Sequence, residues 1–309
     1  MGIATGGVVP DGADAVVPIE RVVEGANSVE VGEAASVGAH VRPVGGDVRA
    51  GEVVVRAGTR LGAAQIGALG AAGVAVVTCG VRPRVALLST GSELRQPGEP
   101  LGLGQIYESN GAMLAAALAT AGATLERVAP VEDDPAAHRV ALARALERAD
   151  VLVSSGGVSV GPHDLVRSVE RDLGVEEVFW GVAVKPGKPL AFGVKGRALV
   201  FGLPGNPVSS LVGLELFVRP ALLALQGVDD PSPRFEFGML GSTLSRNPGR
   251  DELVRSASRF GEDGVVLEPV TGQESHMIVR AAAADTLALV PRGEGELSAG
   301  ARIRYLRLP

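Results

Sequence analysis

VLVSSGGVSVGPHD, residues 151–164, is the stretch of the sequence that decides the fold. An apolar run leads into a loop of small residues and then into an amphipathic segment that begins near His163. This order predicts a strand, a glycine-rich turn and a helix. Glycine lets a ligand approach the backbone closely, and N–H groups at a helix start attract anions. The stretch fits a phosphate cradle and, about equally well, a tight turn without a ligand.

The cradle candidates are Ser155, Gly156, Gly157 and Ser159. Asp164, at the helix start, either caps the helix or helps to hold a divalent cation that bridges to the ligand. The loop has neither the GxxxxGK[ST] spacing of nucleotide triphosphatases nor the GxGxxG spacing of dinucleotide-binding proteins. The sequence therefore argues against both of these classes of protein.

On both sides of this stretch, residues 83–226 alternate strand-like and helix-like segments. Strands are expected within 84–90, 124–130, 150–157, 175–184, 189–194 and 197–205, and amphipathic helices within 110–122, 134–149 and 164–174. Such alternation is typical of parallel strands joined by crossover helices. We expect an α/β domain with an open, mostly parallel sheet, in which ligands bind beyond the carboxyl ends of the strands.

The flanking regions have a different character. Residues 1–60 contain strand-like runs at 15–23, 28–31 and 51–55, which predict a remnant β domain, and 61–82 hold a helix over 62–72 and a connecting segment. Residues 233–309 lack helical periodicity and predict a C-terminal, barrel-like β domain. Because the first apparent strand follows Met1 almost at once, we expect that the chain either starts there or has lost its beginning.

Composition narrows the classes of function. The net charge of −6 argues against duplex nucleic acid as a partner, because DNA phosphates are held by dense Lys/Arg surfaces. Cys79 is the only cysteine, so an internal disulfide is excluded and a reducing compartment fits best. The sequence shows neither a leader peptide nor an apolar run of about 18 residues, and we therefore expect a cytoplasmic protein without a membrane span.

Two further loops follow strands of the same expected sheet. STGSEL, residues 89–94, carries Glu93, and FGLPGNPVSS, residues 201–210, carries Pro204, Gly205, Asn206 and Pro207. The prolines stiffen the second loop, and Asn206 or Ser209 is available to cap the next helix. Each loop alone is more simply explained as an ordinary turn that binds no ligand. Three loops at one edge of a sheet favour a binding site.

Charged residues complete the candidate site. Lys185 and Lys188 lie in VKPGKPLAF, where two prolines restrict the turn, and they read as phosphate binders. In EDDP, one of Asp133 and Asp134 is expected to cap a helix while the other faces the site. Neither a GxSxG elbow nor a metal-binding His or Cys spacing occurs in the sequence.

Eight stretches together resemble the MoeA family, the molybdopterin molybdenumtransferases related to the E domain of gephyrin. In the family's order they are ATGGVVPDGADAVV, VRPVGGDVRAGEVVVRAGTRL, RVALLSTGSEL, LGQIYESNGAML, EDDP, SSGGVSVGPHD, VKPGKPLAF and GLPGNPVSS. The resemblance implies insertion of molybdenum from molybdate into adenylylated molybdopterin, with release of AMP and with Mg²⁺ assisting. It also implies a molybdopterin-binding type of α/β domain and a homodimer.

Carried over by position, the resemblance points to four catalytic residues, Asp164, Glu93, Asp133 and Lys185, of which the three carboxylates are the metal candidates. It adds Thr5, Asp47, Lys188, Pro204, Pro207 and Ser275 as residues that contact the ligand. Gly181 and Ser92 depart from the family, which often has Lys and Asp there. A molybdopterin adenylyltransferase, whose α/β domain shares the SSGG loop, and a non-catalytic molybdopterin-binding scaffold stay open as alternatives.

Overall fold

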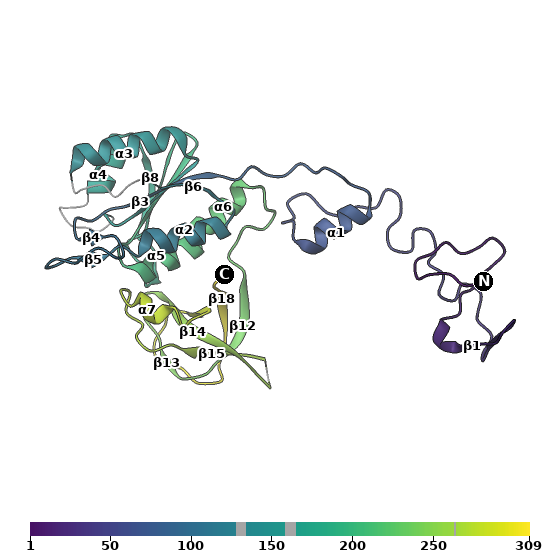
Figure 1. The fold of residues 1–309 in the computed structure, drawn as a ribbon. Coiled ribbons are helices and arrows are strands. Elements are labelled where there is room, and N and C mark those ends of the chain that lie inside the picture. The colour runs from purple at the N-terminus through teal and green to yellow at the C-terminus, as the bar shows by residue number, and fades with distance from the viewer. Residues whose placement is uncertain (128–133, 158–164, 263) are drawn as a thin grey trace. The chain divides into compact units, whose positions relative to one another are not determined.

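The computed structural model describes residues 1–127, 134–157, 165–262 and 264–309 (Figure 1). The chain forms two compact units, Met1–Val77 and Thr78–Pro309. In the first unit, a short 3-10 helix η1 (Ile19–Arg21) leads into β1 (Val22–Glu24), which pairs antiparallel with β2 (Val29–Val31). Helix α1 (Ala63–Ala71) follows.

The expected helix in this unit is confirmed, and the strand expected at 51–55 is wrong. The run expected at 15–23 is a strand only at its end, because residues 15–18 form no strand and 19–21 form η1. Helix α1 ends before Gly73, whose positive φ of 77° suits the residue that stops a helix. Residues 51–55 do not form a strand. Val53 is 73% exposed and Val54 and Val55 are only half-buried, so this run of valines buries neither face as a strand in a sheet would.

The second unit contains the six-stranded sheet that the sequence predicts, in the order β6-β3-β7-β11-β10-β8. Its strands are β6 (Thr124–Arg127), β3 (Arg84–Ser89), β7 (Val151–Ser155), β11 (Ala198–Leu203), β10 (Ala191–Lys195) and β8 (Glu176–Trp180). The first four are mutually parallel, β10 runs antiparallel to β11, and β8, which is antiparallel to β10, again runs in the direction of the first four. The mostly parallel α/β sheet is confirmed.

Helices cover both faces of this sheet (Figure 1). One face packs against α2 (Asn110–Thr120) and the run formed by α5 (Pro207–Gly213), the π-helical η2 (Leu214–Val218) and α6 (Arg219–Leu225). The other packs against α3 (Pro135–Arg148) and α4 (Leu165–Asp172). Along β3, Val85 and Leu87 enter the first core while Ala86 and Leu88 enter the second, as the period of two in a strand requires.

The run Pro207–Leu225 is long and apolar enough, by length and composition alone, to cross a membrane. Glu215 and Arg219 interrupt it, so it is not an unbroken apolar run. In the structure, Leu214, Val218 and Leu222 are fully buried in the core against α2 and the sheet. Glu215 pairs with Arg219 at 2.6 Å. The run is a core helix of the α/β domain.

The C-terminal residues form the barrel that the sequence predicts. Five strands close on themselves in the order β15-β12-β18-β16-β14 and back to β15. They are β12 (Phe235–Leu240), β14 (Asp251–Gly261), β15 (Gly264–Pro269), β16 (Thr286–Val290) and β18 (Arg302–Arg307), with the pair β13 (Leu244–Ser245) and β17 (Glu296–Leu297) and the short helix α7 (Ile278–Ala281) beside them. The two-residue strand β9 (Val184–Lys185) joins the barrel beside β14 and ties it to the α/β domain.

Candidate functional site

The ends of three neighbouring parallel strands lie together at one edge of the sheet. Strand β7 lies between β3 and β11, with Ser155 in register with both Ser89 and Leu203. Backbone bonds continue past the strand ends, because Thr90 N donates to Ser155 O at 3.1 Å and Gly156 N to Leu203 O at 3.0 Å. The loops singled out in the sequence therefore form one continuous edge.

Glycine is required at the centre of this edge. Gly156 and Gly157 have φ values of 95° and 66°, in the left-handed region. A Cβ at Gly156 would lie 2.9 Å from both the carbonyl oxygen and Oγ1 of Thr90, and one at Gly157 would lie 2.5 Å from Val166 Cγ2. A side chain at either position would push the loops apart. Without side chains at these two positions, a ligand is able to approach the backbone closely, as an anion cradle needs.

The start of helix α2 reaches the same edge, which the sequence analysis did not foresee. Asn110 Nδ2 donates to Ser155 Oγ at 2.8 Å and to Gly205 O at 2.7 Å, and so joins two of the loops. Glu108 Oε1 accepts hydrogen bonds from Gly111 N and from Ser89 Oγ. Both residues occur in the stretch LGQIYESNGAML, shortly before and at the start of the helix. Their place in this stretch was the only sequence signal that pointed to them.

The turn between the two predicted lysines passes beside α5. A Cβ built on Gly187, between them, would lie 3.4 Å from Ser209 O of this helix. Lys185 ends strand β9, and its Nζ lies 2.9 Å from Oε1 of Glu252, its cross-strand partner on β14. Lys188 is exposed. The ammonium group predicted to bind phosphate is therefore paired with a barrel carboxylate, which no sequence pattern had indicated.

A barrel loop brings Ser275 to the same helix start, where its carbonyl accepts a 3.0 Å bond from Val208 N. The loop is held by Arg255, whose side chain is 0% exposed. Its guanidinium donates to the carbonyls of Met277, Gly272 and Glu274 at 2.8, 2.8 and 3.2 Å. Burial lowers the pKa of Arg255, and the nearby Glu274 carboxylate opposes that shift. The buried cation thus positions the segment that carries Ser275.

The other predicted residues have varied positions. Glu93 is exposed, with its carboxylate next to Gly91 just beyond β3, and Pro204 is buried, whereas Gly205 is exposed and Pro207 begins α5. Asn206 occupies the N-cap position of α5, but the expected capping bond from its side chain is not formed. Asp134 is the cap of α3, since its Oδ2 accepts a 2.7 Å bond from Ala137 N.

Three predicted residues, Asp133, Ser159 and Asp164, lie outside the described residues. Thr5 and Asp47 are exposed turn residues of the first unit and are described there by themselves. Within the described ranges, Asp, Glu, His and Cys side chains do not form a group of three that suits a metal. The three-carboxylate metal site expected at Glu93 therefore remains a prediction.

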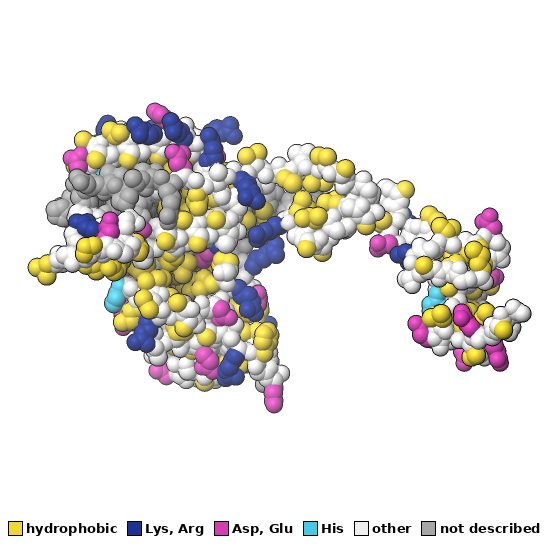
Figure 2. Space-filling view, viewed as in Figure 1, with side chains coloured by type: hydrophobic (Ala, Val, Ile, Leu, Met, Phe, Trp, Pro, Cys, Tyr) yellow, Lys and Arg dark blue, Asp and Glu magenta, His cyan; other side chains and the backbone are white. Residues whose placement is uncertain are grey.

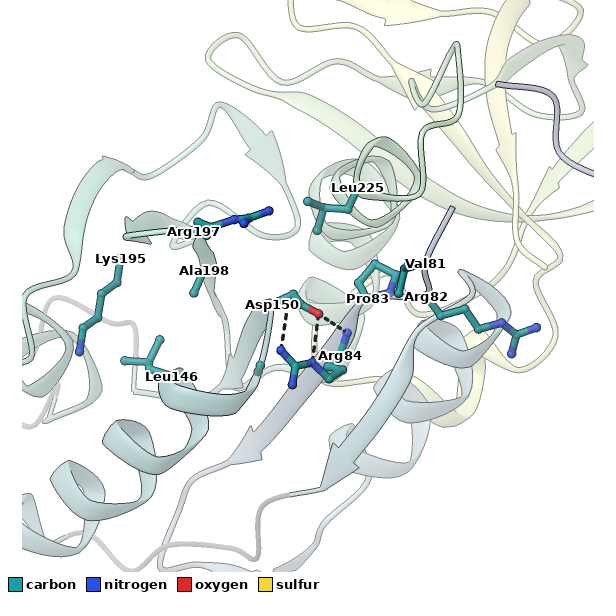
Figure 3. A pocket seen from close by; sticks show the side chains of 11 residues that line it. Val81, Arg82, Pro83, Arg84, Leu146, Asp150, Lys195, Arg197, Ala198 and Leu225 are labelled. Carbon is teal, nitrogen blue, oxygen red and sulfur yellow. Dashed lines mark hydrogen bonds and ion pairs between the residues drawn. The ribbon is translucent and has the colours of Figure 1, made fainter. Parts of the chain in front are cut away.

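A separate hollow of about 550 Å³ lies at the opposite edge of the sheet (Figure 3). Residues at the starts of β3 and β11 form part of its lining. Its positively charged side chains are Arg82, Arg84, Lys195 and Arg197. Hydrogen bonds from the Arg84 side chain and backbone lower the pKa of Asp150 there. Figure 2 shows further Lys and Arg side chains over α3 and along the side of this unit away from β4 (Leu94–Arg95) and β5 (Ile106–Tyr107). Since ligands of such sheets bind at the carboxyl ends of the strands, this hollow is not the candidate site.

Three family models match the chain in succession. They are the MoeA N-terminal region (domains I and II) over residues 1–73, a probable molybdopterin-binding domain over residues 86–224, and the MoeA C-terminal region (domain IV) over residues 238–308. The middle match contains the three strand-end loops. The last contains Glu252, Arg255 and Ser275.

Whole proteins and solved structures agree with these matches. Molybdopterin molybdenumtransferase 2 of Mycobacterium tuberculosis is 38% identical, over 98% of this chain and 75% of that protein. The molybdopterin molybdenumtransferase of Haemophilus influenzae is 33% identical, over 96% of this chain and 74% of that protein. A crystal structure of a molybdopterin biosynthesis MoeA protein from Pyrococcus horikoshii covers 97% of this chain and 73% of its own, with a TM-score of 0.74 and 30% identity. The chain belongs to the MoeA family of molybdopterin molybdenumtransferases.

Proposed function

We propose that this protein inserts molybdenum from molybdate into adenylylated molybdopterin and releases AMP. The observation that carries the proposal is the meeting of three strand-end loops at one edge of the sheet, with Ser275 at the start of α5 and the turn that carries Lys185 and Lys188 beside this helix, in a chain of this family. The backbone N–H groups beside Gly156 and the ammonium of Lys185 suit the phosphates of such a substrate. Nothing found favours an adenylyltransferase or a non-catalytic scaffold.

Within this proposal, the loops hold the phosphates, and Lys185 and Lys188 offset their charge. Ser155, Pro204, Gly205, Asn206, Pro207 and Ser275 line the site. Thr5 and Asp47, in the first unit, are proposed as ligand contacts on the family resemblance alone. The exposed Glu93 carboxylate is a suitable ligand for Mg²⁺, which takes one or two carboxylates together with substrate phosphates. Asp133 and Asp164 are proposed to join it. Bound Mg²⁺ would neutralise charge that develops on the phosphate oxygens. A cytoplasmic homodimer is also proposed, on the family resemblance.

The test is AMP release from adenylylated molybdopterin in the presence of molybdate and Mg²⁺. We expect the parent protein to release AMP well above the rate without enzyme, and Lys185→Ala to lose most of that activity. Lys195→Ala is the matched control, because Lys195 lies at the opposite edge of the sheet, beside the hollow in Figure 3. Release of AMP no faster than in the absence of enzyme would refute the proposal, as would equal loss in the two variants.

A further inference from the structure

The hydrogen-bond partners of Asn110 determine which end of its side-chain amide is the nitrogen. Its amide group lies between Ser155 Oγ, 2.8 Å away, and Gly205 O, 2.7 Å away. A backbone carbonyl oxygen only accepts hydrogen bonds, so the atom facing Gly205 O must be the nitrogen. A reversed amide would place two oxygens against each other. Both hydrogens of Nδ2 are therefore in use.

This orientation determines what the Ser155 hydroxyl is able to do. Because Ser155 Oγ accepts from Asn110, the hydroxyl's own hydrogen is left to donate elsewhere. Ser155 is 3% exposed and ends strand β7, directly before Gly156 of the cradle. Among the described residues, no acceptor takes its hydrogen. Ser154, one residue earlier, differs, since its hydroxyl donates to Phe201 O.

The arrangement also has an unsatisfied atom. Asn110 Oδ1 is shielded from solvent and has no hydrogen-bond partner among the described residues. Buried polar atoms without partners are rare, because desolvating them costs stability. An apolar residue would avoid that cost, but it would leave Gly205 O and Ser155 Oγ without their donor. An asparagine here therefore leaves one oxygen unpaired but supplies two N–H donors to the loops.

We propose that Asn110 is a positioning residue that turns the Ser155 hydroxyl into a hydrogen-bond donor for a phosphate monoester of the ligand. The inference rests on the proposed function for the identity of the ligand, which is either AMP or the phosphate of molybdopterin itself. It is independent of whether molybdenum is transferred.

The test measures binding of AMP and, in a second arm, of molybdopterin to the full chain by calorimetry. A hydrogen bond to a charged group is worth about ten- to a hundredfold in affinity. We expect Ser155→Ala and Asn110→Ala each to lose about that much in the same arm, which identifies the phosphate concerned. The double variant should bind no more weakly than Ser155→Ala alone, because Asn110 acts through Ser155. Ser154→Ala is the matched control and should bind like the parent.

Asn110→Asp separates positioning from a merely structural role and carries the test if Asn110→Ala does not fold. The carboxylate keeps the side chain's shape, but it accepts the Ser155 hydrogen and brings a negative charge. We expect Asn110→Asp to bind phosphate more weakly than Asn110→Ala does. The inference is overturned if Asn110→Asp binds like the parent, if the losses in the double variant multiply, or if the parent binds neither ligand. A parent that binds but releases no AMP refutes the proposed function alone.

Discussion

Replacing Arg255 with methionine tests whether a buried cation holds the barrel loop that carries Ser275. The substitution removes the donors to Met277, Gly272 and Glu274, whose carbonyls lie 2.8, 2.8 and 3.2 Å from the guanidinium. A buried polar group that loses its partner costs about 1–3 kcal/mol, and carbonyls in a loop regain part of this from water. With about 1 kcal/mol for each carbonyl, we expect a loss of about 3 kcal/mol.

The assay is differential scanning calorimetry of the full chain. For a unit of about 150–250 residues, 1 kcal/mol lowers the melting temperature by about 2–4 °C, so we expect a fall of about 6–12 °C in the transition of the unit Thr78–Pro309. Arg259→Met is the matched control on the same strand, because Arg259 is exposed and its pair with Glu268 is worth less than about 1 kcal/mol. Arg255→Lys should not restore stability, since one ammonium does not reproduce the planar fork. A melting temperature for Arg255→Met within about 2 °C of the parent's would refute the reasoning.

Three other outcomes follow from single contacts. Glu252→Gln frees Lys185 from its ion pair, so AMP should bind about two- to fivefold more tightly in calorimetry; weaker binding would show that Glu252 instead orients the lysine. Asp134→Ala removes the cap of α3 and should cost about 1 kcal/mol in urea unfolding while AMP binding is unchanged, and altered binding would contradict its role as a cap. Asp150→Asn tests pH dependence, because hydrogen bonds from Arg84 lower the pKa of Asp150 below 3.8 in the folded protein. That stabilisation is present above the ordinary pKa and is lost as the pH falls through the lower, folded value. The parent's advantage over Asp150→Asn in melting temperature should therefore shrink below about pH 4, and a constant difference down to pH 2 would disagree.

The elements of the α/β domain were predictable because their signals are local. Each strand alternates between two buried faces, and the glycines of SSGG announce a turn that a Cβ would block. The cap of α3 also followed from sequence, although only the structure assigned it to Asp134. The valine run at residues 51–55 gave a false signal, because strand propensity without a surface to pack on does not form a strand.

The contacts that organise the candidate site were not predictable in the same way. Asn110 is 45 residues from Ser155 and 95 from Gly205, and only folding makes them neighbours. Arg255 resembled any charged residue on an alternating strand until burial and three carbonyls gave it a role. A sequence motif indicates which residue types a site needs. Which distant residues contact them depends on how the strands and helices pack.

The barrel contributes to the site at two points, and this bears on which reaction the fold supports. Strand β9 ends at Lys185 and pairs with β14, so the position of this ammonium depends on the barrel. Ser275 reaches the start of α5 from the barrel loop that Arg255 holds. The strand-end loops alone are proposed as an anion cradle, and such a cradle would suit metal insertion and adenylylation equally well. The residues that distinguish this chain's site are those that the barrel supplies or fixes. A protein with the same α/β domain but without a barrel would therefore keep the cradle and lack Ser275 and the Glu252 partner of Lys185.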